Sequence, residues 1–249
     1  MKIIAVTNQK GGTGKTTSTI NIGAGLSRLG QRVLLIDLDP QANLSFSLGL
    51  PDPGALPNVY QLLTGQIALS RAVLDINGLG LIPSSPLLVN LETDLASHKN
   101  KATLLQQALA SPLDWDYILL DCPPSSGLIT LNALTAAQEL YVPVQAEFLA
   151  LQGMSKLLET IEQVRQDYNP SLLLAGIIAT RYDQRRVLNR EVIGSLSEHF
   201  GNKLFNTYIH ENIALAEAPS FGQDIFSYRP DSNGARDYMA LCREIVERR

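Results

Sequence analysis

The chain has 249 residues, 45% of them hydrophobic, so it can bury a full core, and we expect one domain over residues 1–249. Its formal net charge of −4 excludes a generally basic nucleic-acid-binding chain and leaves only a local basic patch for any such contact. Two cysteines without C-x-x-C spacing predict neither a disulfide framework nor a thiolate metal site. The longest later apolar run, 172–179, is far shorter than the ~20 residues of a membrane helix, so we expect a cytoplasmic protein without a membrane partner.

Short apolar runs alternate with segments of helical spacing along the whole chain. We predict strands at 2–7, 32–36, 79–82, 116–121, 139–144, 172–179 and 204–209, and helices at 15–29, 99–110, 127–137, 149–167, 187–199 and 234–247. This alternation indicates an α/β fold with a mostly parallel, twisted sheet that is covered by helices on both faces. Ligands of such folds bind beyond the carboxyl ends of the strands, so the residues that follow each run are the candidates for chemistry.

A glycine-rich segment follows the first run. Residues 8–17 read Asn-Gln-Lys-Gly-Gly-Thr-Gly-Lys-Thr-Thr and lie between a predicted strand and a predicted helix, which is the context of a phosphate-binding loop. Glycines let backbone N–H groups approach phosphate oxygens, and the helix adds free N–H groups and the positive end of its dipole. Lys15 can reach the outer phosphates, and the Thr16 hydroxyl can bind Mg²⁺. The predicted phosphate site comprises Lys10, Gly11, Gly12, Thr13, Gly14, Lys15, Thr16 and Thr17.

Aspartates end two of the later runs. Asp121 ends the run at 116–121, and an acidic residue at the end of a buried strand beside a phosphate loop is the Walker B arrangement, which holds Mg²⁺ directly or through water. Asp37 and Asp39 follow the run at 32–36 and can face the same site, although Asp, Pro and Asn in this segment also fit a helix cap and turn. Cys122 has no basic neighbour in sequence, so we interpret it as a small buried residue.

The phosphate loop departs from the general P-loop pattern, because Gln9 stands where that pattern has glycine and a second lysine, Lys10, precedes the glycines. This variant resembles the deviant Walker A loop of the MinD/ParA ATPases. The Asp-x-Asp-Pro segment at 37–40, the Asp-Cys-Pro-Pro-Ser segment at 121–125 and the Glu-Ala-Pro-Ser segment at 217–220 extend the resemblance to ParA/Soj-type partition ATPases over essentially the whole chain.

The resemblance implies a P-loop NTPase fold and slow hydrolysis of ATP with Mg²⁺. It gives catalytic roles to Lys10, Lys15 and Asp39, with Lys10 of each subunit reaching the phosphates of the other in an ATP-dependent homodimer. Asp39 would orient the attacking water. Thr16, Asp37 and Asp121 would hold the metal or its water shell, and Pro219 would line the adenine pocket.

The resemblance further implies nonspecific double-stranded DNA and a ParB-like activator as partners, with a cytoplasmic, nucleoid-associated location. Because the first predicted strand begins at residue 2, we expect no N-terminal helix-turn-helix and therefore no site-specific operator binding.

The clearest basic stretch lies at 179–190. Arg185, Arg186 and Arg190 are spaced to begin a helix whose other face, Val187, Ile193 and Leu196, is buried. One hypothesis is that two such patches in a dimer bind the phosphate backbone of duplex DNA without reading bases. The alternative is a solvated helix start. Arg181 lies just after its strand and is better placed for the base or ribose of the nucleotide.

The sequence departs from the family pattern at Glu211 and Ala214, where relatives commonly have basic residues, so the second half of the DNA surface is in doubt. A MinD-like positioning ATPase, a ParA-like carrier of a protein cargo and a metabolic ATP-using enzyme on the same fold remain the alternatives. The C-terminal helix presents Tyr238, Leu241, Cys242 and Ile245 on one side, which favours packing on its own sheet over membrane binding.

Overall fold

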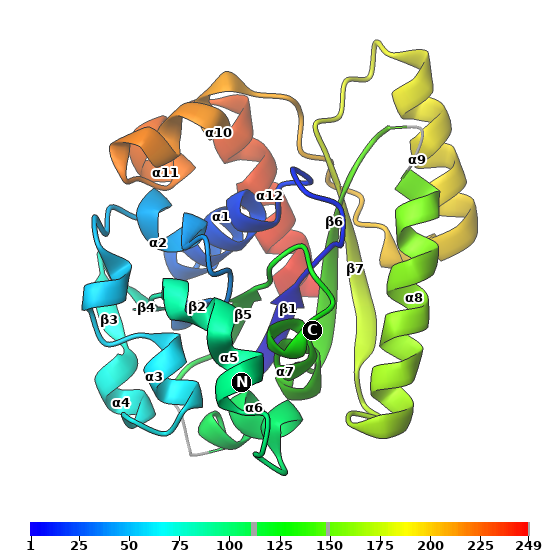
Figure 1. Ribbon diagram of the computed structural model, residues 1–249. Coiled ribbons are helices and arrows are strands. Elements are labelled where there is room, and N and C mark those ends of the chain that lie inside the picture. The colour runs from blue at the N-terminus through cyan, green and yellow to red at the C-terminus, as the bar shows by residue number, and fades with distance from the viewer. Residues whose placement is uncertain (111–113, 148–149, 249) are drawn as a thin grey trace.

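The computed structural model describes residues 1–110, 114–147 and 150–248, and it is an α/β structure (Figure 1). Within these ranges the strands form one seven-stranded sheet in the order β3-β4-β2-β5-β1-β6-β7. All neighbouring strands are parallel except β3 and β4. The strands are β1 (Lys2–Val6), β2 (Val33–Asp37), β3 (Leu74–Ile76), β4 (Leu79–Ile82), β5 (Tyr117–Asp121), β6 (Glu139–Gln145) and β7 (Leu173–Thr180).

Helices cover both faces of this sheet. The α-helices are α1 (Lys15–Arg28), α2 (Asn43–Ser47), α3 (Val59–Leu63), α4 (Leu69–Ala72), α5 (Leu91–Asp94), α6 (Leu104–Ala108), α7 (Leu128–Ala136), α8 (Ala150–Asp167), α9 (Val187–Phe200), α10 (Ile213–Glu217), α11 (Ile225–Tyr228) and α12 (Asn233–Glu247). Short 3-10 turns lie at Pro53–Ala55, Pro86–Asn90, Lys101–Thr103, Gly201–Lys203 and Ala218–Phe221. The predicted fold class is confirmed.

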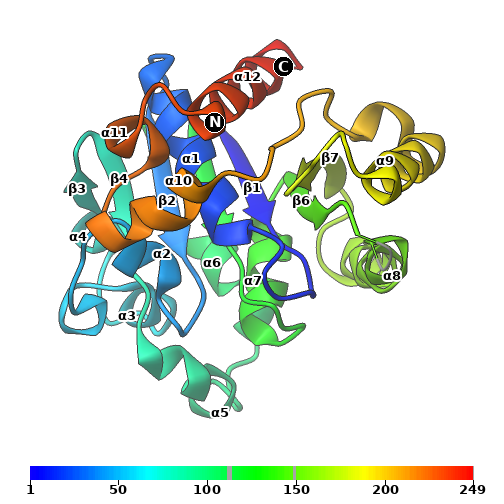
Figure 2. The same cartoon turned by 90° about the horizontal axis from the view of Figure 1, so that it is seen from above.

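The alternation of side chains along the strands divides the core into two layers. One layer packs between the sheet and α1, α2, α11 and α12, and the other between the sheet and α3, α5, α6, α7, α8 and α9. Figure 2 shows α1 and α12 on one side of the sheet and α7 on the other. The central strands are buried on both faces, which explains why their sequences are nearly continuous Val, Ile and Leu.

The prediction of a seventh strand at 204–209 is wrong. This segment makes only isolated bridges, from Leu204 to Ile177 and from His210 to Tyr182. Its backbone N–H groups at 206 and 207 donate to the Glu244 carboxylate on α12 instead of to a strand. The apolar residues that suggested a strand are buried because the segment runs between β7 and α12. An irregular segment that is buried in this way has the same apolar sequence pattern as a strand.

The actual seventh strand, β3, was not predicted. It forms an antiparallel hairpin with β4 through the two-residue turn Asn77-Gly78, whose φ angles are 53° and 84°. Asn-Gly is a strong signal for such a turn. The three residues of β3 are too few for a periodicity argument, so the dipeptide was the only usable signal.

The predicted helices are confirmed with two changes. The segment at 99–110 is a 3-10 turn followed by the short α6, and the predicted first residue of the helix at 149–167 lies outside the described residues. In α9, Ile193 and Leu196 are buried as predicted, but Val187 is 58% exposed because it lies in the first turn, beyond the edge of the sheet. The predicted buried side of α12 is confirmed.

Asn169, in the loop between α8 and β7, forms hydrogen bonds with the C-terminal end of α7. Its buried Nδ2 donates to the carbonyl oxygens of Leu134 (2.9 Å) and Ala137 (2.6 Å). Asn169→Ala would leave both buried carbonyls without this donor, so we expect the free energy of unfolding to fall by about 2–4 kcal/mol in urea denaturation. The matched variant Asn202→Ala removes an exposed amide and should change it by less than about 0.5 kcal/mol. Equal stabilities for the two variants would contradict the role of Asn169.

Candidate nucleotide-binding site

The carboxyl ends of the parallel strands carry the polar groups of the site. Asp37 ends β2 and Asp121 ends β5, and the register of the sheet places them level with each other. Gln145 ends β6 and is paired with Thr180 at the end of β7. Residues 8–17 follow β1 directly, so the phosphate loop lies at the middle of this edge (Figure 2), where the sequence predicts it.

The backbone of the phosphate loop requires glycine at two positions. Gly12 and Gly14 have φ angles of 75° and 89°, in the region that side chains strain. Gly14 is the residue before α1, which begins at Lys15 without a side-chain cap and without an acidic residue in its first turn. The first N–H groups of α1 and the positive end of its dipole are therefore available to an anion such as a phosphate group.

Two residues that the sequence analysis did not select fix the loop to the sheet. The Nε2 of Gln145 donates to the carbonyl oxygen of Gly12 (2.5 Å), and the Oγ1 of Thr180 donates to that of Thr13 (2.9 Å). Both residues end an apolar strand with a polar side chain, which is the signal that could have found them. Their hydrogen bonds turn the loop carbonyls toward the strands, which leaves its N–H groups for a ligand.

The two lysines of the loop lie in different surroundings. Lys15 is 8% exposed, and burial lowers the pKa of its amine, an effect that the charges of Asp121 and Asp39 oppose. The side chain of Lys10 is 41% exposed, and its Nζ forms an ion pair with the exposed Glu147 carboxylate (2.9 Å). Lys15 is thus held inside its own chain, whereas Lys10 lies at the surface.

Asp121 joins the sheet to the first helix. Its carboxylate accepts hydrogen bonds from the hydroxyls of Thr16 (2.8 Å) and Thr19 (3.2 Å). Complete burial and the neighbouring Asp37 raise the pKa of Asp121 to about 8, against the opposite effects of Thr16 and Lys15. Burial in the metal-free chain therefore favours the neutral form of this carboxyl group.

Asp37 and Asp39 have distinct environments at the end of β2. Asp37 is fully buried, which raises its pKa to about 6, although its carboxylate accepts hydrogen bonds from the backbone N (2.9 Å) and hydroxyl (2.6 Å) of Ser45. The Asp39 carboxylate accepts from Gln41 N (2.9 Å), and its carbonyl oxygen accepts from the hydroxyl of Ser84 (2.5 Å). Ser45 and Ser84 were not selected from the sequence, because nothing local pairs them with the aspartates.

The donor set fits Mg²⁺. In the part of the chain that the structure describes, no group of three or more His, Cys, Asp or Glu side chains is arranged to hold a metal ion, so a cation here depends on other donors as well. Mg²⁺ commonly binds one or two carboxylates together with substrate phosphates. Asp121, Asp37 and the Thr16 hydroxyl offer such donors, and a cation would favour the charged forms of both buried carboxyl groups.

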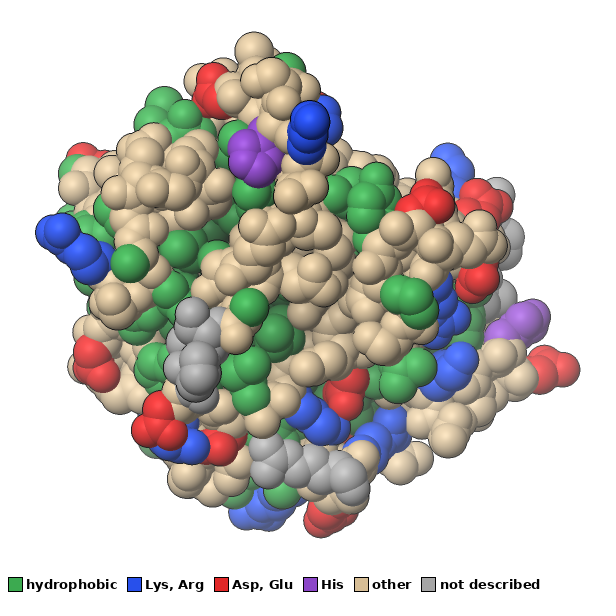
Figure 3. Space-filling model, turned by 90° about the horizontal axis from the view of Figure 1, so that it is seen from below, with side chains coloured by type: hydrophobic (Ala, Val, Ile, Leu, Met, Phe, Trp, Pro, Cys, Tyr) green, Lys and Arg blue, Asp and Glu red, His purple; other side chains and the backbone are tan. Residues whose placement is uncertain are grey.

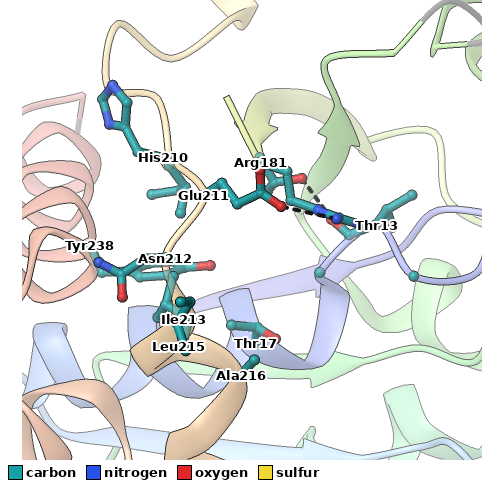
Figure 4. Close-up of a pocket in the computed structure, with 14 residues that line it drawn as sticks. Thr13, Thr17, Arg181, His210, Glu211, Asn212, Ile213, Leu215, Ala216 and Tyr238 are labelled. Atoms are coloured by element: carbon teal, nitrogen blue, oxygen red, sulfur yellow. Dashed lines mark hydrogen bonds and ion pairs between the residues drawn. The ribbon is translucent and has the colours of Figure 1, made fainter. Parts of the chain in front are cut away.

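A cavity of about 470 Å³ opens beside the phosphate loop (Figure 4). It is lined by Gly12, Thr13, Gly14, Thr17, Thr180, Arg181, Ile209, His210, Glu211, Asn212, Ile213, Leu215, Ala216 and Tyr238. The predicted Arg181 lies here, with its guanidinium paired to Glu211 (3.1 Å). Pro219 is not among the lining residues, so its contact with the base stays a prediction. The mix of apolar walls and loop N–H groups suits a nucleoside phosphate.

The basic stretch at the end of β7 is internally paired. Arg185 makes two bonds to Asp183 (both 2.9 Å), which hold the pKa of that carboxyl group down at about 2. Arg186 pairs with Asp183 (3.5 Å) and Glu211 (3.3 Å). Arg190 donates to the carbonyl oxygen of residue 184 (2.7 Å). Arg185 and Arg186 precede α9, and of the three arginines only Arg190 lies on it.

The thiol of Cys122 is buried, and burial together with Asp121 raises its pKa far above the usual range. A reactive cysteine needs the opposite shift. The interpretation of Cys122 as a packing residue is confirmed.

The fold and the site define the class: an α/β P-loop nucleotide-binding protein with two lysines on its phosphate loop. A family model described as an AAA domain matches residues 1–174. The chain is 48% identical to the chromosome-partitioning ATPase Soj of Thermus thermophilus over 245 residues, which are 98% of this chain and 95% of the relative. It is 39% identical to the chromosome partitioning protein ParA of Caulobacter vibrioides over 253 residues, with 100% and 95% covered. The chain belongs to the ParA/Soj family of partition ATPases.

Solved structures have the same fold. The chain is similar to a structure named cobyrinic acid a,c-diamide synthase from Mycobacterium smegmatis with bound ATP analog and magnesium (TM-score 0.88, 38% identity, 99% of this chain and 94% of that one). It is also similar to an ATP complex of McdA from Cyanothece (TM-score 0.85, 26% identity, 99% and 96%). Among the described residues, none of the helices has the length and apolar character needed to cross a bilayer.

The raised pKa of Asp121 predicts how stability depends on pH. Between an unfolded value of about 3.9 and the folded value of about 8, the folded metal-free chain binds more protons than the unfolded chain. The stabilisation is therefore fully present below about pH 4 and is lost as pH rises through about 8. Asp121→Asn mimics the protonated group and removes this titration. We expect the free energy of unfolding of the wild type, measured with EDTA relative to Asp121→Asn, to fall from about pH 5 to about pH 8. A difference that is constant across this range would contradict the assigned pKa.

Proposed function

We propose that this chain is a DNA-partition ATPase whose ATP-bound homodimer binds nonspecific duplex DNA and is released when a ParB-like activator stimulates hydrolysis. The observation that carries the proposal is the division of the two loop lysines between an interior and an exposed position. Lys15 would bind the phosphates of the nucleotide held by its own chain. Lys10 lies at the surface beside the same loop, where its amine is available to a nucleotide held by a second copy.

Each polar group at the strand ends then has a role in hydrolysis. Lys15 stabilises charge on the outer phosphates, and Asp39 orients the attacking water. Thr16 and Asp121 would hold Mg²⁺, with Asp37 supporting its water shell, and the cation supplies charge neutralisation on the phosphates. A cation held here would lower the pKa of Asp121, which burial raises in the metal-free chain, and would favour the carboxylate form that binds it.

Dimerisation requires Lys10 to exchange one anionic partner for another. In the single chain its amine is paired with Glu147, and in the dimer it would contact the partner's triphosphate. The exposed ion pair is worth at most about 1 kcal/mol, so it opposes this exchange only weakly. ATP drives the change to the extent that it binds the dimer more tightly than the monomer.

The Lys10→Ala variant tests this arrangement. It removes the second lysine and leaves Lys15 in place, so we expect a folded chain that stays monomeric in excess Mg-ATP, where the wild type dimerises. Multi-angle light scattering after size-exclusion chromatography measures the mass directly.

The control for this variant is Lys203→Ala, which removes an exposed lysine near the opposite edge of the sheet, beside the first residues of β1 and β6. It should dimerise like the wild type. A dimer of normal mass formed by Lys10→Ala would remove Lys10 from the interface and with it the main support of the proposed function.

The DNA contact is proposed for the basic stretch that follows β7. Arg185 and Arg186 are 85% and 60% exposed, and Arg190 lies one turn into α9. On the face seen from below, basic side chains are interspersed with acidic ones (Figure 3). This mixed charge does not favour binding of the DNA phosphates to that face. A dimer doubles the basic stretch, and two weak contacts on one duplex give a much stronger one.

Arg185→Glu combined with Arg186→Glu should weaken retention of a random-sequence duplex in Mg-ATP. Arg185 and Arg186 can each contact at most one phosphate, so the slope of log affinity against log salt should become shallower by roughly 1 to 2 per protomer, measured by fluorescence anisotropy.

Arg71→Glu with Lys99→Glu changes the net charge by the same amount at two other exposed sites and should have a small effect. A loss of affinity that is equal in the two double variants would indicate a general effect of charge and would move the DNA surface away from the basic stretch.

A metabolic ATP-using enzyme is the competing candidate, because one similar structure is named a cobyrinic acid a,c-diamide synthase. A partition ATPase should turn over ATP faster with DNA and a ParB-like protein. A synthase needs its small-molecule substrate instead. A MinD-like membrane switch predicts ATP-dependent sedimentation with liposomes, and a carrier of a protein cargo predicts stimulation by a protein other than ParB.

A further inference from the structure

Glu211 connects the nucleotide cavity to the basic stretch through a single carboxylate. Its Oε1 accepts a hydrogen bond from Arg181 (3.1 Å), and its Oε2 accepts one from Arg186 (3.3 Å). Figure 4 shows Glu211 and Arg181 pointing toward each other across the cavity. Arg186, the other partner, belongs to the proposed DNA surface. One acidic group is therefore shared between a residue of the cavity and a residue of the surface.

The backbone around Glu211 holds this carboxylate in place. The N–H of Glu211 donates to the carbonyl oxygen of Tyr182 (3.3 Å), and the N–H of Tyr182 donates to that of Ile209 (3.0 Å). His210 is fixed in turn, because its N–H donates to the Asp237 carboxylate on α12 (2.9 Å) and its ring contacts the edge of Tyr182. The loop that carries Glu211 is thus attached to β7 and to α12 on either side.

The side chain of Glu211, in contrast, does not hold the backbone of the described residues in place. Asp183, the acid within the basic stretch, is 14% exposed and accepts hydrogen bonds from the backbone N–H of Arg185 and from its side chain. Asp183 therefore shapes the turn before α9. The Glu211 carboxylate is 45% exposed, and the bonds it accepts come from the two arginine side chains. It can be neutralised without removing a backbone contact.

We propose that Glu211 is an internal competitor for DNA phosphate that sets the affinity and salt dependence of the basic stretch. This inference rests on the proposed function. A duplex that engages Arg186 must displace the carboxylate, and it must do so beside a negative charge that repels its phosphates. When the ion pair between Arg186 and Glu211 breaks, Glu211 is still paired with Arg181. The competition is therefore weak enough to be overcome when two basic stretches act together in a dimer.

The test is the Glu211→Gln variant, titrated with a fluorescent random-sequence duplex in Mg-ATP between about 50 and 200 mM salt. Glutamine keeps the size of the side chain and removes the charge. Losing an exposed competing ion pair should tighten binding by up to about fivefold at the lower salt concentration. Arg186 would then have only Asp183 as a competing acid, so the slope of log affinity against log salt should steepen by up to about 0.9 per protomer. A purely structural effect of the substitution would not steepen this slope.

Glu198→Gln is the matched control, because it removes one negative charge from an exposed position on α9. Its affinity and slope should stay close to those of the wild type. Glu211→Arg is a second variant that should tighten binding further.

The outcomes separate the two proposals. Unchanged or weaker binding by Glu211→Gln, or an equal gain in Glu198→Gln, would overturn the role of Glu211 while leaving DNA binding intact. If the wild type retains no duplex in Mg-ATP, the proposed function fails, and the inference about Glu211 fails with it.

Discussion

The hydrogen bonds that Asp121 accepts from the first helix are the interaction on which the rest of the site depends. This buried carboxyl group lies at the end of β5, the strand between β1 and β2, and accepts hydrogen bonds from the hydroxyls of Thr16 and Thr19. It therefore fixes how the helix that follows the phosphate loop approaches the sheet. A charged group in this position is costly without a partner, which is why burial raises the pKa of Asp121. A bound cation would offset this cost and favour the charged form.

The charged groups of the candidate nucleotide-binding site fall into a buried set and an exposed set. Solvent screens the interactions of the exposed set more strongly than those of the buried set. Lys15, Asp37 and Asp121 are desolvated, which shifts the pKa of each, and the charges of Asp37 and Lys15 act on Asp121 in opposite directions. Lys10 and Arg186 are exposed and form ion pairs within the chain that are individually weak. Weak pairs of this kind can be exchanged for contacts to a second copy or to DNA at little cost. The proposed ATP-dependent dimer would combine a rigid interior with replaceable surface contacts.

The carboxylate of Glu211 reduces the positive charge of the surface beside the cavity, because it pairs with two arginines that would otherwise add to the basic stretch. The family fold is unaffected, since the carboxylate carries no backbone contact. A change in surface charge of this kind would adjust the proposed DNA binding while leaving the hydrogen bonds of the phosphate loop in place.

The sequence by itself determined the elements whose signal is local. The apolar runs gave six of the seven strands, the glycine pattern gave the phosphate loop, and the aspartates at the ends of β2 and β5 followed from their positions after buried strands. Only the tertiary structure decided which distant groups meet. Gln145 and Thr180 hold the loop from strands more than a hundred residues away, Glu147 pairs with Lys10, and the backbone at 206–207 binds Glu244 where a strand was expected. These contacts arise from strand order and chain crossings, which bring together side chains that no spacing in the sequence relates.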